Sequence, residues 1–153
     1  MITVHIVDDH KILVEGLKKL IDSSGFATTV DLSYTGAECL WKLGFNQPQV
    51  LLLDINLPDC SGIELCKTIK NRFPGVKIVA LTSYSEYTIV RQMLENGASG
   101  YVIKNAMPEE ILLGIQTVAD DKTFLCEEID CLMSKRSLEQ IWLTPRERAL
   151  LRL

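Results

Sequence analysis

The chain has 153 residues, of which 47% are hydrophobic and 24% are charged, and its formal net charge is −4. These values match a soluble globular domain with an appendage, and the net charge gives no indication of a nucleic-acid-binding surface over the chain as a whole. The charge is uneven, because residues 134–153 contain five basic and two acidic side chains and therefore carry +3, which leaves −7 for the rest. An acidic body with a basic tail predicts two modules with different partners.

The cysteine pattern and the hydropathy of the chain indicate where the protein works. The five cysteines form no CxxC pair and no metal-ligand spacing, so we expect reduced core cysteines in a cytosolic protein. No stretch approaches the ~20 apolar residues of a membrane span, and no basic leader precedes the first strand-like segment. We therefore expect a cytoplasmic protein without a membrane partner.

Strand-like and helix-like segments alternate five times along the chain. The expected strands cover residues 2–8, 27–33, 50–54, 76–82 and 100–104. The expected helices lie at 13–21, from 35, at 63–72, from 83 through 93, and at 108–119. Thr35 with Glu38, and Ser83 with Glu86, have the spacing of capping boxes, and Pro108 suits a first helical turn.

This alternation predicts an α/β fold with a five-stranded parallel sheet. The segment at residues 50–53 is apolar at every position, as in a strand covered by helices on both faces. Ligands of such sheets bind outside the carboxyl ends of the strands. Five polar side chains are expected at these ends, namely Asp8, Asp9, Asp54, Thr82 and Lys104.

These five residue types suit one kind of chemistry. Clustered carboxylates favour a hard divalent cation, and Mg²⁺ is usual where a phosphate shares the site. A carboxylate beside Mg²⁺ can attack phosphorus and become an aspartyl phosphate. Lys104 can then neutralise one phosphoryl oxygen, and the Thr82 hydroxyl can hydrogen-bond another. A single aspartate at a strand end is commonly a helix cap or turn residue, so the hypothesis rests on the whole set.

Four segments carry a resemblance to a known family. "IVDDH" at 6–10, "LLLDINLPDCSGIEL" at 51–65, "LTSY" at 81–84 and "GASGYVIKNAMPEE" at 97–110 resemble the receiver domain of two-component response regulators. The resemblance covers residues 1–119 and implies a (βα)₅ flavodoxin-like fold. It implies Mg²⁺ as cofactor and phosphorylation of Asp54 by a partner histidine kinase. Such a protein is not an enzyme, apart from promoting its own phosphorylation and dephosphorylation.

The resemblance also implies a role for the residues around the acceptor. Asp9 and Asp54 would bind Mg²⁺ through their side chains. Asn56 would contribute its backbone carbonyl, and Asp8 would act mainly through water. Gly62 would shape the loop that follows the acceptor.

Two further residues are implied to form a switch. The Thr82 hydroxyl would move to the phosphoryl group, and the Tyr101 ring would swing inward behind it. Many receivers have proline directly after the lysine, whereas Asn105 follows Lys104 here. This departure, together with "DDH", resembles the NarL/FixJ branch of the family.

The last residues of the chain predict a DNA-binding domain as the part that the receiver controls. "LTPRERALLRL" at 143–153 resembles the opening of a LuxR-type helix-turn-helix, with Thr144 as cap, Pro145 in the first turn and Glu147 three residues after the cap. One helix cannot form that motif, so we expect a truncated regulator. The expected domains are a receiver at 1–120, a linker at 121–142 and the start of a DNA-binding domain at 143–153. Within the linker, residues 121–130 suggest an extended piece and a helical turn near the last receiver helix.

The leading hypothesis is thus a phosphorylation-dependent transcription regulator, a homodimer that binds DNA through a further C-terminal domain. One alternative is a phosphorylation-independent pseudo-receiver that dimerises through its last helices, against which the complete acidic set, Thr82 and Lys104 argue. Another is a phosphotransfer enzyme of the haloacid dehalogenase type. That chemistry needs an aspartate two residues after the nucleophile, where this chain has Asn56.

Overall fold

Six parallel strands form the sheet of the computed structural model, which describes residues 1–141 and the side chains of residues 1–135. The strand order is β2-β1-β3-β4-β5-β6. The strands are β1 (Ile2–Val7), β2 (Ala27–Ser33), β3 (Val50–Leu53), β4 (Lys77–Thr82), β5 (Gly100–Ile103) and β6 (Phe124–Leu125). The helices are α1 (Lys11–Asp22), α2 (Gly36–Leu43), α3 (Gly62–Arg72), α4 (Tyr87–Glu95), α5 (Pro108–Ala119) and α6 (Glu127–Ile141).

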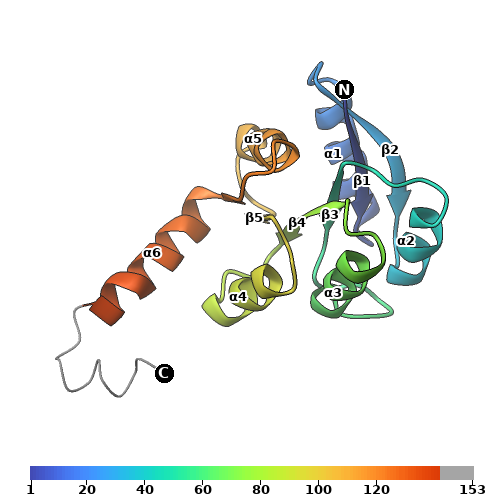
Figure 1. Cartoon of the computed structure of the whole chain (residues 1–153). Coiled ribbons are helices and arrows are strands. Elements are labelled where there is room, and N and C mark those ends of the chain that lie inside the picture. Colours follow the sequence, from blue (N-terminus) through green and yellow to red (C-terminus); the bar gives the residue numbers. More distant parts are fainter. Residues whose placement is uncertain (142–153) are drawn as a thin grey trace.

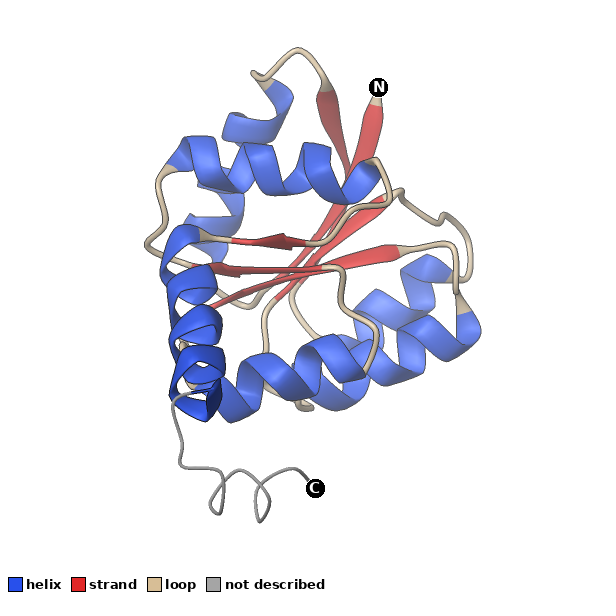
Figure 2. Cartoon of the chain, turned by 60° about the vertical axis from the view of Figure 1, so that its left-hand side comes forward, coloured by secondary structure: helices blue, strands red, loops and turns tan. Residues whose placement is uncertain are grey.

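The helices cover both faces of the sheet, as the sequence predicts. The α1 and α5 helices lie on one face, and α2, α3 and α4 lie on the other (Figures 1 and 2). Every residue of the central strand β3 is buried, which explains why it is apolar at each position. The core therefore forms two layers, one on each side of the sheet.

The sheet has one strand more than the five that the sequence predicts. The two residues of β6 pair in parallel with β5, with Phe124 opposite Gly100 and Leu125 opposite Tyr101. This strand lies within the segment expected to be extended near the last receiver helix. A two-residue strand has no readable alternation of apolar and polar positions, so the sequence gives no separate signal for it.

The α6 helix continues from β6 and extends away from the sheet (Figure 1). Its first turns remain attached to the core, because Ile129 is fully buried and the Cys126 N–H donates a 3.1 Å hydrogen bond to the Tyr101 carbonyl. The segment expected as a linker, residues 121–142, thus contains β6 and α6. The expected helix-turn-helix at 143–153 lies outside the described residues. Among the helices that the structure describes, none has the length and hydropathy needed to cross a bilayer.

The helix starts agree with the capping signals at two of three places. Before α2, the Glu38 N–H donates to Thr35 Oγ1 at 3.0 Å, and the Glu38 carboxylate accepts from the Tyr34 N–H at 2.7 Å. The α5 helix begins at Pro108, as expected. The expected start of α4 at residue 83 is wrong, because α4 begins at Tyr87 and has no side-chain cap. The preceding residues form the loop that leaves the carboxyl end of β4.

The loop between β3 and α3 brings two backbone segments very close together. The Gly62 N–H donates to the Ile55 carbonyl at 2.6 Å. A Cβ atom at Gly62 would lie 2.3 Å from the Asp54 carbonyl oxygen and 2.6 Å from the Ile55 Cα. Since both neighbours are backbone atoms, no side-chain movement can relieve this contact. Gly62 is therefore required for α3 to begin this near the end of β3.

We predict that Gly62→Ala lowers the free energy of unfolding by roughly 2 kcal/mol or more, because the added methyl group displaces the backbone after β3. Urea unfolding measures this. The matched control is Gly16→Ala in α1, where the new Cβ would meet nothing within 4 Å. Alanine favours a helix interior over glycine by about 1 kcal/mol, so the control should be neutral or stabilising. Equal losses in the two variants would contradict the close-approach argument.

Candidate functional site

Two buried carboxylates lie side by side at the carboxyl ends of β1 and β3. The strands pair in parallel with Val7 opposite Leu53, so the next residues, Asp8 and Asp54, leave the sheet together. The Asp54 N–H donates to the Val7 carbonyl at 2.9 Å and extends this register by one residue. Asp8 is 1% exposed and Asp54 is 2% exposed. Such a pair is unfavourable unless positive charge is close by.

Lys104 supplies that charge from the carboxyl end of β5. Its ammonium nitrogen lies 2.9 Å from Asp8 Oδ2 and 3.2 Å from Asp54 Oδ2. Asp9 adds a third, more exposed carboxylate next to the pair. When all four groups are ionised, three carboxylates and one ammonium leave two negative charges, which a divalent cation would neutralise.

His10, for which the sequence predicts no role, also belongs to this cluster. Its Nδ1 lies 2.7 Å from Asp8 Oδ1, 3.4 Å from Asp9 Oδ1 and 3.2 Å from Lys104 Nζ. The backbone N–H of His10 donates to Asp8 Oδ1 at 2.9 Å, so the chain turns around that carboxylate. An imidazole directly after two clustered aspartates was the available signal, because imidazole and carboxylate are both metal ligands.

The donor set suits a metal ion. Asp8, Asp9, His10 and Asp54 each offer one ligand atom, and these atoms all lie within 4.8 Å of one another. Three of the four residues are carboxylates, which fit the preference of Mg²⁺ for oxygen. The Asn56 N–H donates to Asp54 Oδ1 at 3.2 Å and holds the following loop against the acceptor carboxylate.

The environment of Asp54 raises the pKa of its carboxyl group. Burial is the main cause, and the negative charge of Asp8 adds to it. Lys104 and the Asn56 N–H act in the opposite direction by stabilising the charged form. Ionised Asp54 is thus poorly solvated and depends on nearby cations.

Thr82 and Tyr101, the expected switch pair, are joined through one residue of the loop after β4. The Thr82 hydroxyl accepts a 3.2 Å hydrogen bond from the Tyr84 N–H. The Tyr101 hydroxyl donates a 2.7 Å hydrogen bond to the Tyr84 carbonyl. A displacement of the Thr82 hydroxyl therefore acts on the same peptide segment that holds the Tyr101 ring.

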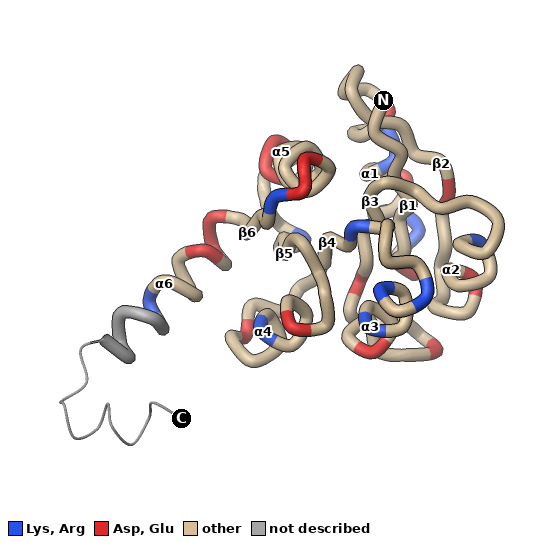
Figure 3. The backbone as a smooth tube through the Cα atoms, viewed as in Figure 1, with Lys and Arg blue, Asp and Glu red and all other residues tan. Residues whose placement is uncertain are grey.

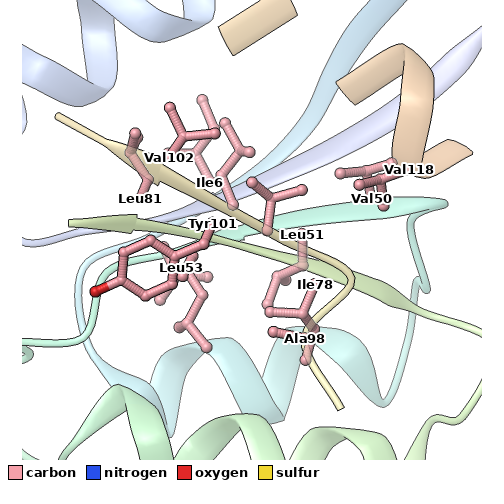
Figure 4. Packing of buried hydrophobic residues seen from close by; sticks show 14 of the residues in the cluster. Ile6, Val50, Leu51, Leu53, Ile78, Leu81, Ala98, Tyr101, Val102 and Val118 are labelled. Carbon is pink, nitrogen blue, oxygen red and sulfur yellow. The ribbon is translucent and has the colours of Figure 1, made fainter. Parts of the chain in front are cut away.

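The Tyr101 ring already lies inward in this structure. Its side chain is fully buried among the residues of the hydrophobic core (Figure 4). This burial raises the pKa of the Tyr101 hydroxyl well above its ordinary value, so the group remains a donor at neutral pH. The proposed inward state thus has a defined hydrogen-bond partner, the Tyr84 carbonyl.

Comparison with known families gives a match over most of the chain. Residues 4–116 match the family model described as "Response regulator receiver domain". The matched range includes every residue of the acidic cluster, Lys104, and both members of the expected switch pair.

Several curated relatives cover the chain at more than 30% identity. The transcriptional regulatory protein MctR of Rhizobium johnstonii is 34% identical over 98% of this chain and 71% of its own length. The DNA-binding transcriptional activator DevR/DosR of Mycobacterium tuberculosis is 32% identical over 82% of this chain and 58% of its own length. The oxygen regulatory protein NreC of Staphylococcus carnosus is 32% identical over 78% of this chain and 56% of its own length. The chain thus spans little more than half of two of these relatives.

Solved structures agree with this fold. A LuxR-family two-component response regulator from Aurantimonas superposes with a TM-score of 0.87 at 24% identity, over 90% of this chain and 99% of the other, which supports the fold alone. RcsB from Salmonella enterica serovar Typhimurium, solved bound to a promoter, gives a TM-score of 0.82 at 28% identity over 99% of this chain and 76% of its own.

We predict that Asp54→Asn raises the free energy of unfolding at neutral pH in metal-free buffer. The fold raises the pKa of Asp54, so this carboxyl group favours the folded state while it is protonated. Its contribution to the free energy of unfolding is complete below the unfolded-state pKa of about 3.9 and is lost as the pH rises through the folded-state pKa. Asparagine removes this loss while keeping the side-chain shape. Urea unfolding should show a stability gain for the variant that is larger at pH 7 than at pH 4. A gain of the same size at both pH values would contradict the assignment to Asp54 ionisation.

Proposed function

Since this chain belongs to the response regulator receiver domain family, we propose that Asp54 accepts a phosphoryl group from a partner histidine kinase. One observation carries this proposal. Asp8 and Asp54 are buried side by side at the sheet edge and share the Lys104 ammonium at 2.9 and 3.2 Å. A phosphorylation-independent module has no need for this charge arrangement, because burying like charges destabilises a fold.

The chain's own residues support an in-line transfer. An ionised Asp54 oxygen attacks the phosphorus, and the bond from phosphorus to the donor's leaving atom breaks. Lys104 already contacts the acceptor carboxylate and would pair with a phosphoryl oxygen. The Thr82 hydroxyl, at the end of the neighbouring strand β4, would donate to another oxygen. In this proposal the protein promotes two reactions, the phosphorylation of its own Asp54 and the hydrolysis of the resulting aspartyl phosphate.

A divalent cation completes the charge balance of the proposed site. Asp9 and Asp54 would hold Mg²⁺ through their side chains, with Asp8 beside it and the Asn56 backbone carbonyl as a further ligand. When bound, Mg²⁺ neutralises the carboxylates and the phosphoryl oxygens. This assignment is supported by the short distances between the three carboxylates, each of which offers a ligand atom within 4.8 Å of the others.

The proposed output path runs from the site to α6. A Thr82 hydroxyl that turns toward a phosphoryl oxygen gives up its hydrogen bond from the Tyr84 N–H. The Tyr84 carbonyl holds the Tyr101 hydroxyl, and the Tyr101 carbonyl accepts from the Cys126 N–H at the start of α6. A population shift in the loop after β4 would thus change how α6 is held. The α6 end nearest the core carries acidic residues in its first turn (Figure 3).

We further propose that the chain is part of a cytoplasmic transcription regulator. The names of the relatives and the promoter-bound neighbour support this reading. Residues 1–120 would form the receiver, 121–142 the connection and 143–153 the start of a LuxR-type DNA-binding domain. DNA would be bound by that domain, and two copies would form a homodimer.

The acceptor assignment predicts labelling of the protein by a small phosphodonor such as acetyl phosphate in the presence of Mg²⁺. Asp54→Asn should reduce the label at least tenfold, since the nucleophilic carboxylate is gone. Asp59→Asn is the matched control, because this carboxylate lies in the same loop but binds the Gly36 and Ala37 N–H groups at the start of α2. Intact-protein mass spectrometry measures the label. An unlabelled wild-type protein would overturn the proposed function.

The output path predicts faster hydrogen exchange at the start of α6 after phosphorylation. Residues 126–133 are held by the Cys126 hydrogen bond to Tyr101 and by burial of Ile129, and both depend on the position of β5. Exchange followed by mass spectrometry should show the increase in phosphodonor-treated wild type. The same treatment of Asp54→Asn should leave the exchange unchanged. Identical α6 exchange in labelled and unlabelled wild type would disprove this path.

A further inference from the structure

The strand β2 forms one outer edge of the sheet, with β1 on its inner side (Figure 1). An edge strand leaves half of its backbone N–H and C=O groups without a partner strand and is a template for pairing with another chain. The sequence of β2, "ATTVDLS", contains three β-branched residues, one charged residue and no proline, so its composition favours strand pairing. In the structure, however, side chains from outside the strand occupy this edge.

The first of these side chains is Lys42 of α2, which binds the Leu32 carbonyl. The adjacent Ser33 carbonyl faces β1, because it accepts a 3.0 Å hydrogen bond from the Asp8 N–H. Successive carbonyl groups of a strand point to opposite sides, so the Leu32 carbonyl faces away from β1. The Lys42 ammonium donates a hydrogen bond to this outward carbonyl. A strand that approaches the edge here would have to displace a charged group.

Two further side chains bind outward N–H groups in the first half of β2. The Phe26 carbonyl faces β1, because it accepts a 2.9 Å hydrogen bond from the first N–H of that strand. By the same alternation, Ala27 and Thr29 face outward. The Thr29 N–H donates to Asp22 Oδ1 at 2.7 Å, and the Ala27 N–H donates to Ser24 Oγ at 3.3 Å. The end of α1 and the turn after it thus cover this part of the edge.

A bulge lies between the two covered parts of the edge. Val4 lies opposite Thr29 and His5 lies opposite Asp31, so Val30 is an extra residue in β2. A bulge bends its strand and interrupts a regular row of hydrogen-bonding groups, which also opposes edge pairing. The exposed edge is therefore protected by a carboxylate before the bulge and an ammonium after it.

We infer that the outer edge of β2 is a latent pairing surface for a second copy of this chain, and that Asp22 and Lys42 hold it closed. A second copy fits because two β2 strands can pair antiparallel around Thr28, ahead of the bulge. Ala27 of each copy then lies opposite Thr29 of the other, so their outward N–H and C=O groups meet, and no charged residues face each other. With this edge closed, the proposed homodimer forms through other surfaces.

The test compares two double variants with the same net charge. Asp22→Ala with Lys42→Met removes both contacts from the edge. Glu15→Ala with Lys67→Met removes one carboxylate and one ammonium elsewhere, from exposed side chains that make no hydrogen bond or ion pair with another described residue. Sedimentation velocity measures self-association of the unphosphorylated proteins at rising concentration. Hydrogen exchange followed by mass spectrometry measures protection of residues 27–33 in the same samples.

We expect the Asp22→Ala, Lys42→Met variant to self-associate with a dissociation constant about tenfold lower than that of the wild type, because its outward backbone groups have lost their partners. Exchange of residues 27–33 in this variant should become slower as its concentration rises, since pairing protects the outward N–H groups. The control variant and the wild type should show no dependence of this exchange on concentration.

Association and β2 exchange equal to those of the control would overturn the inference. Association without slower exchange at residues 27–33 would also overturn it, because the contact would then lie on another surface. The single variants Asp22→Ala and Lys42→Met are measured in the same way and decide the question if the double variant does not fold. The inference does not depend on phosphorylation of Asp54, so its failure would leave the proposed function unchanged.

Discussion

A single ammonium group between two buried carboxylates is the interaction on which the site depends. Lys104 bridges Asp8 and Asp54, which the parallel pairing of β1 and β3 forces to leave the sheet side by side. Without positive charge this edge of the sheet would carry an uncompensated buried pair. One ammonium group does not balance the cluster, because Asp9 adds a third carboxylate. The cluster therefore keeps a net negative charge that a further cation would neutralise.

Much of this architecture was predictable because parallel sheets place strand ends together. The buried run at Val50–Leu53 and the polar residues at the ends of four strands were enough to predict the two-sided sheet and the cluster of polar side chains at its edge. The start of α4 was not predictable, because a Ser-x-x-Glu spacing is a local signal and the path of the preceding loop is set by the end of β4. β6 is too short for a pattern, and the orientation of His10 depends on charges brought together only by the fold.

The hydrogen bonds that join Thr82 to Tyr101 pass through backbone atoms of Tyr84. Tyr84 offers its N–H to Thr82 and its carbonyl to Tyr101, so its side chain is not what connects them. The resemblance implied a role for the Thr82 and Tyr101 side chains, but a backbone peptide unit between them leaves no signal in the residue types. Residue identity at 84 would affect this link mainly through the conformation of the loop.

The attachment of α6 shows that the folded unit extends beyond the residues that the family model matches. The family match ends at residue 116, but Cys126 and Ile129 are sealed from solvent and β6 completes the edge of the sheet beside β5. A fragment cut at residue 116 would leave β5 as an open edge and uncover apolar surface. An autonomous domain would therefore have to include β6 and the first turn of α6.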